Sequence, residues 1–184
     1  FEPAFEAVRQ ANQGALSPQA LDQALQACWF TAFDLVAQRH HFTPAMRAAG
    51  WQQFSQMEAK APLRGYADIG LLPRIPLRRY LVTSGFRRLQ DSKIDALGIR
   101  PWFEQVLIDA IDAPPTGAVH GKQALFEQIL TRKGCTPRQM LVVGDNPLSE
   151  LAVGRALGAT TVQTVRPGVE PWPLADHRVD GLQG

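Results

Sequence analysis

The stretch MLVVGDNPLSELAVGRALGA, residues 140–159, decides how the rest of the chain is interpreted. Its first residues are apolar and stop at Gly144 and Asp145, which is typical of a buried strand that ends at a carboxylate. A short polar loop containing Asn146 follows, and a helical pattern begins near Glu150. The stretch therefore predicts a strand, a turn that carries acids and a helix, which is one half of an α/β repeat.

The same alternation of strand and helix extends on both sides of this stretch. Apolar or β-branched runs predict strands at 79–85, 103–111, 139–145 and 160–165. Helical patterns lie between them, and glycines follow their last residues, as is common where helices end. Short connections between alternating strands and helices predict a Rossmann-like α/β fold, in which a parallel sheet is flanked by helices.

The N-terminal third has a different pattern, with helical periodicity and no predicted strand. Ser17 and Thr43 each precede a proline, an arrangement that favours a capped helix start with proline at the first helical position. We expect residues 1–62 to form a small all-helical domain with an aromatic interior, and residues 63–184 to form the α/β core.

The composition excludes several classes of protein. The chain has 184 residues with a net charge of +2, and its arginine pairs are too short for a nucleic-acid surface. It has no apolar run near the roughly 20 residues of a membrane span. Cys28 and Cys135 lie far apart without metal-ligand spacing, which suits reduced thiols in the cytoplasm. We expect a cytoplasmic protein with neither a nucleic-acid nor a membrane partner, and its oligomeric state stays open.

Polar side chains fall at the predicted carboxyl ends of strands and at a helix start, where ligands of parallel sheets bind. They suit a phosphate group and a hard cation, which are bound by hydroxyls, backbone N–H groups, cations and carboxylates. The candidates are Thr83, Ser84 and Gly85 at the end of the first strand, Lys122 after a loop at 112–121, and Asp145 at the end of the third strand with Glu150 in the helix that follows.

Each of these residues also has an ordinary structural interpretation. Thr83 and Ser84 could form a simple turn, and Lys122 could be a solvated lysine at a helix start. Asp145 could cap the next helix, and Glu150 could be a first-turn acid favoured by the helix dipole. Their joint order and spacing favour a common site.

That joint order resembles the haloacid dehalogenase (HAD)-like hydrolases, in the branch with a helical cap (C1-type). The segments that resemble the second, third and fourth motifs of the family are YLVTSG (80–85), Gly121-Lys122 and LVVGDNPLSELAVGRALGA (141–159). ADHRVDGLQ near the end resembles the closing segment of such chains. The resemblance covers residues 63–184 closely and implies that residues 1–62 are the helical cap.

The resemblance also implies roles on the phosphate side of the site. Thr83 would donate a hydrogen bond to the phosphate, and the backbone at Ser84 and Gly85 would help to hold it. Lys122 would stabilise negative charge on the transferring phosphoryl group.

On the metal side, the resemblance implies a Mg²⁺ cofactor. Asp145 would bind the ion, Glu150 would assist directly or through water, and Asn146 is a further candidate. The implied reaction is hydrolysis of a small phosphorylated metabolite, a phosphomonoester, through an aspartyl-phosphate intermediate.

The chain departs from the family pattern in three ways. Glu150 stands where aspartate is commoner, and Lys122 lacks a following proline. The first motif, Asp-x-Asp-x-Thr after an apolar strand, is missing, and LIDAIDAPPT (107–116) imitates it only loosely through Asp109 and Asp112. We expect that the given sequence is trimmed upstream of the missing nucleophile and central strand, and that it is inactive alone.

Two alternatives remain open at this point. The chain could be a non-catalytic phosphate-binding or regulatory protein that lacks the nucleophile. Within the family it could be a dehalogenase, although the acids at 145 and 150 favour the metal-using branch. An Asp-x-Asp-x-Thr motif encoded upstream of Phe1 would favour the enzyme.

Overall fold

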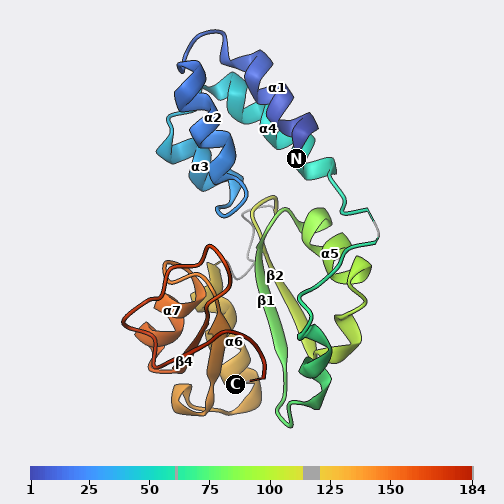
Figure 1. The fold of residues 1–184 in the computed structure, drawn as a ribbon, viewed down its shortest axis with the longest axis vertical. Coiled ribbons are helices and arrows are strands. Elements are labelled where there is room, and N and C mark those ends of the chain that lie inside the picture. Colours follow the sequence, from blue (N-terminus) through green and yellow to red (C-terminus); the bar gives the residue numbers. More distant parts are fainter. Residues whose placement is uncertain (61, 114–120, 184) are drawn as a thin grey trace. The chain divides into compact units, whose positions relative to one another are not determined.

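A computed structural model describes residues 1–60, 62–113 and 121–183 (Figure 1). Most of the loop predicted at 112–121 lies outside the described residues. Contacts within the chain divide it into two compact units. The first unit comprises residues 1–63, 84–98 and 110–115, and the second comprises residues 64–83, 99–109 and 116–184. Each unit is described by itself below.

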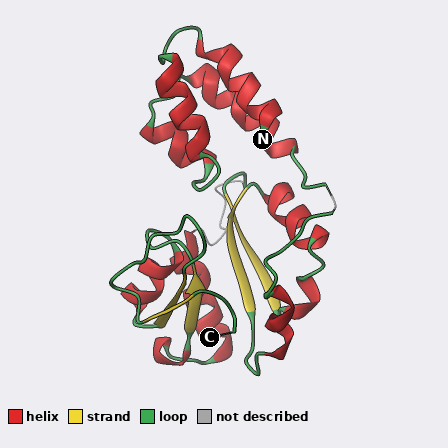
Figure 2. Cartoon of the chain, viewed as in Figure 1, coloured by secondary structure: helices red, strands yellow, loops and turns green. Residues whose placement is uncertain are grey.

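The helical prediction for the N-terminal residues is confirmed, because the described part of residues 1–60 holds helices and no strand (Figure 2). Both predicted caps are present: Ser17 Oγ accepts the Ala20 N–H at 3.2 Å, and Thr43 Oγ1 accepts the Met46 N–H at 3.2 Å. A turn at 28–32 interrupts the helical pattern, since its aromatic and β-branched residues favour helix weakly. The helices are α1 (Glu2–Asn12), α2 (Pro18–Ala27), α3 (Phe33–Arg39) and α4 (Pro44–Gln56).

The core of the first unit is aromatic. The Phe54 and Phe86 rings stack with centroids 5.6 Å apart, and the Phe33 ring lies 5.0 Å from Phe54. A Cβ at Gly50 would lie 2.3 Å from the Phe33 ring, so α4 needs glycine there for close packing. Because Phe86 precedes α5 (Arg87–Ala96), this core includes a helix that comes after the first predicted strand.

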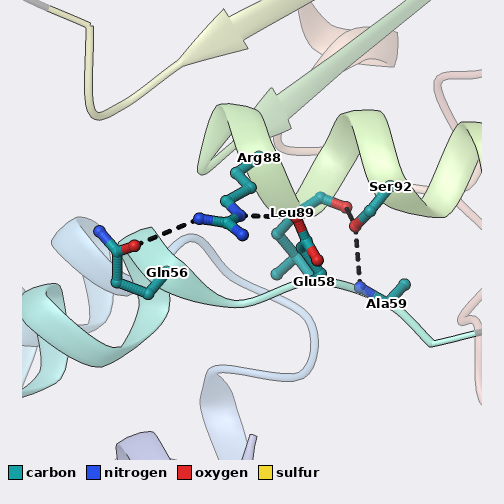
Figure 3. A network of polar contacts seen from close by, with 6 residues as sticks. All are labelled: Gln56, Glu58, Ala59, Arg88, Leu89 and Ser92. Atoms are coloured by element: carbon teal, nitrogen blue, oxygen red, sulfur yellow. Dashed lines mark hydrogen bonds and ion pairs between the residues drawn. The ribbon is translucent and has the colours of Figure 1, made fainter.

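Polar contacts also join α5 to the chain that follows α4 (Figure 3). Arg88 pairs with Glu58 at 2.7 Å, and the Ser92 hydroxyl accepts the Ala59 N–H at 2.8 Å. The ion pair is half exposed and adds little stability, so we infer that it mainly fixes the path of the chain. These contacts and Phe86 explain why residues 84–98 group with residues 1–63, whereas the predicted domain boundary at 62 stays a prediction.

The parallel α/β class is confirmed, but the strands form two separate sheets where one was expected. In the first sheet, β1 (Tyr80–Gly85) and β2 (Gln105–Ala110) run in the same direction, since hydrogen bonds join Glu104 N to Arg79 O and Ile111 N to Gly85 O. The second sheet has the order β3-β4-β5, with β3 (Leu141–Gly144), β4 (Thr160–Thr164) and β5 (His177–Val179) all parallel. Within the described chain, β1 and β3 each pair with one strand.

The third strand is apolar in sequence yet alternates in burial. Val142 is buried and packs with Phe126 and Ala159, whereas Leu141 and Val143 are each 47% exposed. The Val142 side of β3 faces helical residues. The residues that the structure describes do not cover the opposite side. Continuous apolar sequence therefore does not correspond here to burial on both faces.

The remaining helices of the second unit complete the α/β pattern. These are α6 (Gly121–Lys133), α7 (Glu150–Leu157) and the 3₁₀ turns η1 (Ile69–Arg74), η2 (Arg100–Trp102) and η3 (Pro137–Gln139). A Cβ at Gly154 would lie 2.8 Å from Val142, so this glycine lets α7 approach β3 closely. No helix in the described ranges combines the length and apolarity needed to cross a membrane.

A buried carboxylate anchors the closing segment of the chain. Asp68 is 4% exposed and accepts hydrogen bonds from Arg166 Nη2 at 2.6 Å and from the Leu182 N–H at 2.7 Å. The Arg166 guanidinium also lies over the Tyr66 ring at 4.3 Å. We infer that these contacts fix the end of the second unit after β5, a three-residue strand too short to be predicted from its pattern.

Candidate active site

An ion pair between two of the predicted site residues is the centre of the candidate site. Lys122 Nζ lies 2.5 Å from Glu150 Oε2, and the two side chains are only 15% and 13% exposed. Lys122 lies in the first turn of α6, and Glu150 is the first residue of α7. The two helix starts therefore bring together residues that are 28 positions apart in the sequence.

The second oxygen of Glu150 holds the loop that follows β3. Glu150 Oε1 accepts the Asn146 N–H at 2.9 Å, and Asn146 Oδ1 accepts the Leu148 N–H at 2.9 Å. A Cβ at Gly144 would lie 2.3 Å from Glu150 Oε1, so the Glu150 side chain fits closely over a position that needs glycine. We infer that the glutamate folds back over the strand end and orders the loop that carries Asp145.

Charge and burial act in opposite directions on Glu150. Burial raises the pKa of its carboxyl group, but the nearby Lys122 charge and the hydrogen bonds from Lys122 and Asn146 together lower it more. The net pKa lies below its ordinary value, so Glu150 is ionised at neutral pH. The pair thus presents a fixed cation whose charge is partly balanced.

Asp145 differs from Glu150 in its surroundings. It is exposed, its backbone oxygen accepts a hydrogen bond from Gln163 Nε2 at 3.3 Å, and its carboxylate has no polar partner among the described residues. A carboxylate of this kind at a strand end suits a hard cation such as Mg²⁺, which takes one or two carboxylates along with waters and substrate phosphates.

Glu150 fits direct ligation of a metal less well in this arrangement. Both of its oxygens are engaged, so an ion bound to it would have to replace Lys122 or the Asn146 N–H. In the described ranges no three His, Cys, Asp or Glu side chains gather as a metal-holding group. Asp145, Glu150 and Asn146 as metal ligands therefore stay a prediction, and Asp145 has the more suitable surroundings.

A contact that was not predicted from the sequence fixes the start of α6. Asp109 Oδ1, near the end of β2, accepts the Gly121 N–H at 2.8 Å, and Gly121 has φ +81°, a value that favours glycine. Asp109 therefore helps to place Lys122, the next residue. The sequence does show that Asp109 is an acid at a strand end ahead of a helix start. Because the stretch around it resembles the missing first motif, we considered Asp109 from the sequence only as a substitute for that motif.

Asp112, the second acid of the stretch 107–116 that resembles the missing first motif, also has a structural role. Asp112 Oδ1 accepts the Arg87 N–H at 2.9 Å and so satisfies a free donor at the first turn of α5. This contact lies within the first unit.

The predicted phosphate-binding residues are the last three of β1, and they are divided between the units. Thr83 belongs to the second unit, and Ser84 and Gly85 belong to the first. Gly85 has φ +141°, and a Cβ there would lie 2.6 Å from Gln90 Nε2, so the position requires glycine. The binding of phosphate by these three residues stays a prediction.

The depressed pKa of Glu150 predicts acid sensitivity of the second unit. In the unfolded chain the Glu150 carboxyl group has its ordinary pKa of 4.5 and binds its proton more tightly than in the folded chain. The stabilisation that the ionised carboxylate provides is therefore complete above pH 4.5 and is lost as the pH falls through the lower pKa of the folded chain. We expect Glu150→Gln to lower the free energy of unfolding by about 1–2 kcal/mol at pH 7, with a difference that shrinks as the pH falls below 4.5.

Denaturant titrations of the parent protein and the variant between pH 3 and pH 7 measure this difference. Glu127→Gln, a change at an exposed glutamate of α6, serves as the control and should give no such pH-dependent difference. If the loss of unfolding free energy in Glu150→Gln is the same at every pH from 3 to 7, the lowered pKa of Glu150 is wrong.

The comparison with known sequences finds a family similarity over part of the chain. Residues 70–158 match the family model described as haloacid dehalogenase-like hydrolase. This part of the chain is similar to the haloacid dehalogenase-like hydrolases. The match includes β1, Lys122, Asp145 and Glu150, so the residues of the candidate site lie inside the haloacid dehalogenase-like segment. No curated protein sequence matches the chain.

Solved structures show the same fold at low sequence identity. A HAD phosphatase from Thermococcus onnurineus has a TM-score of 0.62 and 17% identity, over 98% of this chain and 85% of that chain. The HAD-hydrolase YfnB from Bacillus subtilis, described as bound to magnesium, has a TM-score of 0.63 and 15% identity, over 100% of this chain and 90% of that chain. A predicted phosphoglycolate phosphatase from Haemophilus somnus has a TM-score of 0.62 and 14% identity, over 98% and 87%.

Proposed function

We propose that the protein is a Mg²⁺-dependent phosphomonoesterase of the haloacid dehalogenase-like family. Lys122 would neutralise charge on the transferring phosphoryl group, and Asp145 would hold the metal ion. Glu150 would keep Lys122 in place, and Thr83 with the backbone at Ser84 would bind the phosphate. The attacking aspartate, which would form an aspartyl-phosphate, is not among the 184 residues.

The observation that carries the proposal is the part-buried Lys122–Glu150 pair, whose Glu150 lies a few residues after Asp145, a carboxylate without a partner among the described residues. A lysine with an engaged counter-ion is fixed in position, which is what stabilisation of a developing phosphoryl charge requires. An exposed Asp145 is suited to a metal ion that also contacts the substrate phosphate. The magnesium bound to the Bacillus subtilis neighbour agrees with this choice of ion.

Two other functions compete with this proposal. Structures described as a dehalogenase share the fold, one of them with a TM-score of 0.52 and 15% identity, so a dehalogenase is the alternative within the family. A phosphate-binding or regulatory protein without turnover is the alternative outside enzymes. Asp145 favours the phosphatase because carbon–halogen cleavage by an aspartate nucleophile does not call for a carboxylate that holds a metal ion.

The proposed substrate is a small phosphorylated metabolite of the cytoplasm, with no role for nucleic acid or membranes. The net charge of +2 over 184 residues supports the exclusion of nucleic acid, because a phosphate backbone is bound by clustered cations.

The test is an activity screen of the protein expressed from its whole gene. We expect phosphate release from p-nitrophenyl phosphate and from some members of a panel of metabolite phosphomonoesters, with activity lost in EDTA and restored by Mg²⁺. Residues 1–184 alone should release no phosphate. Halide release from a 2-haloacid would favour the dehalogenase, and phosphate binding without any turnover would favour the regulatory protein.

A further inference from the structure

A fully buried glutamine lies beside the strand end that precedes Asp145. Gln163 is on β4, where it pairs in register with Gly144, the last residue of β3. Its exposed fraction is 0%. Apolar residues usually fill such positions, because burying an amide without hydrogen bonds costs free energy. The partners of this amide therefore indicate why a glutamine is placed there.

The hydrogen bonds of the Gln163 amide go to backbone groups of two different loops. Its Nε2 donates to the carbonyl oxygen of Glu170 at 2.9 Å and to that of Asp145 at 3.3 Å. Its Oε1 accepts the Trp172 N–H at 2.6 Å. Glu170 and Trp172 lie between β4 and β5, whereas Asp145 follows β3. Gln163 thus joins the loop of the candidate metal carboxylate to a second loop of the same unit.

The peptide group between Asp145 and Asn146 is held at both of its polar ends. Its carbonyl oxygen, on Asp145, accepts from Gln163, and its N–H, on Asn146, donates to Glu150 Oε1 at 2.9 Å. A peptide group is planar, so two hydrogen bonds of this kind fix the orientation of the whole plane. Because that plane sets ψ of Asp145, it also restricts where the Asp145 carboxylate lies.

Thr161, two residues earlier on β4, shows what a purely structural contact looks like in this strand. It is also fully buried. Its hydroxyl donates to Asp176 Oδ2 at 2.8 Å and accepts the Asp176 N–H at 3.1 Å, so it too ties β4 to the segment before β5. A buried polar side chain can therefore order that segment without touching Asp145, and the bond from Gln163 to Asp145 needs a further explanation.

We propose that Gln163 is a positioning residue of the metal site, which orients Asp145 through the 145–146 peptide group and links that orientation to the loop at 170–172. The inference rests on the proposed function, in which Asp145 holds Mg²⁺. Groups that orient a metal ligand contribute about 10- to 100-fold to metal affinity. Such coupling is reciprocal, so a bound ion also strengthens the contact between Gln163 and the Trp172 N–H.

The first test is Mg²⁺ binding by isothermal titration calorimetry to the protein expressed from its whole gene. Gln163→Met keeps the length of the side chain and removes its hydrogen bonds, so it should weaken Mg²⁺ binding at least about 10-fold. Thr161→Val is the matched control, because it removes buried hydrogen bonds from the same strand. It should lower the Tm and leave Mg²⁺ affinity unchanged. Unchanged Mg²⁺ affinity in a folded Gln163→Met variant, or an equal loss in Thr161→Val, would overturn the proposal.

The second test is amide hydrogen exchange in the parent protein, which does not depend on whether Gln163→Met folds. Saturating Mg²⁺ should slow exchange of the Trp172 N–H about 10-fold or more, by the reciprocity of the coupling. It should leave exchange of the Asp176 N–H, which is bonded to Thr161, unchanged. Equal slowing of both N–H groups, or no slowing at Trp172, would overturn the proposal.

The two tests also separate this inference from the proposed function. A parent protein that binds no Mg²⁺ overturns both. If the parent binds Mg²⁺ and loses that binding in Asp145→Asn, the metal site stands. Unchanged Mg²⁺ affinity in Gln163→Met or unchanged exchange at Trp172 then overturns the role of Gln163 alone.

Discussion

Replacing Asp145 by asparagine is expected to reduce Mg²⁺-dependent phosphatase activity at least about 1000-fold in the protein expressed from its whole gene, while the fold persists. The carboxylate is exposed and has no polar partner among the described residues, so its charge contributes little to folding. Asparagine keeps the shape but supplies a neutral oxygen, which binds a hard divalent cation far more weakly than a carboxylate does.

Three measurements test this prediction: phosphate release against Mg²⁺ concentration, Mg²⁺ binding by calorimetry, and Tm. Asp180→Asn is the matched control, because it makes the same change at another exposed aspartate of the second unit. The control should keep full activity. Turnover and Mg²⁺ dependence that stay unchanged in Asp145→Asn would remove Asp145 from the metal site.

The order and type of the main elements could be predicted because they depend on local patterns. The caps at Ser17 and Thr43 and the four strands before the closing segment each have a signal within a few residues. The division of the sheet could not be predicted in the same way, because pairing joins residues that are distant in sequence. The exposure of Leu141 and Val143 depends on what covers β3, which an apolar run does not reveal.

The candidate site was predictable as a set of residue types and not as a set of contacts. Spacing and family resemblance indicated Lys122, Asp145 and Glu150, but not that Glu150 would use both oxygens within the protein. Asp109 was overlooked as a positioning residue because its partner is the backbone N–H of Gly121, and a backbone donor leaves no signal in residue types. Contacts of this kind depend on the close approach of helix starts and strand ends.

Lys122→Met is expected to reduce the phosphatase activity at least about 100-fold and also to destabilise the second unit. The loss of activity follows from removing the fixed cation that faces the phosphoryl group, a contribution of several kcal/mol in comparable sites. The loss of stability follows because Glu150, 13% exposed, would keep its charge without its partner. Removing one partner of such a pair costs about 3 kcal/mol, which corresponds to a fall in Tm of roughly 6–12 °C.

The double variant Lys122→Met/Glu150→Gln separates the two effects. Because the second change neutralises the stranded carboxylate, most of the lost Tm should return while the activity stays low. Recovery of Tm without activity would assign Lys122 a role in the reaction beyond holding the fold, with Glu150 as its positioning residue. Recovery of both would mean that Lys122 acts only through stability, and the proposed contact with the phosphoryl group would then be wrong. If the Lys122→Met variant keeps its Tm, the ion pair seen between α6 and α7 does not stabilise the unit in solution.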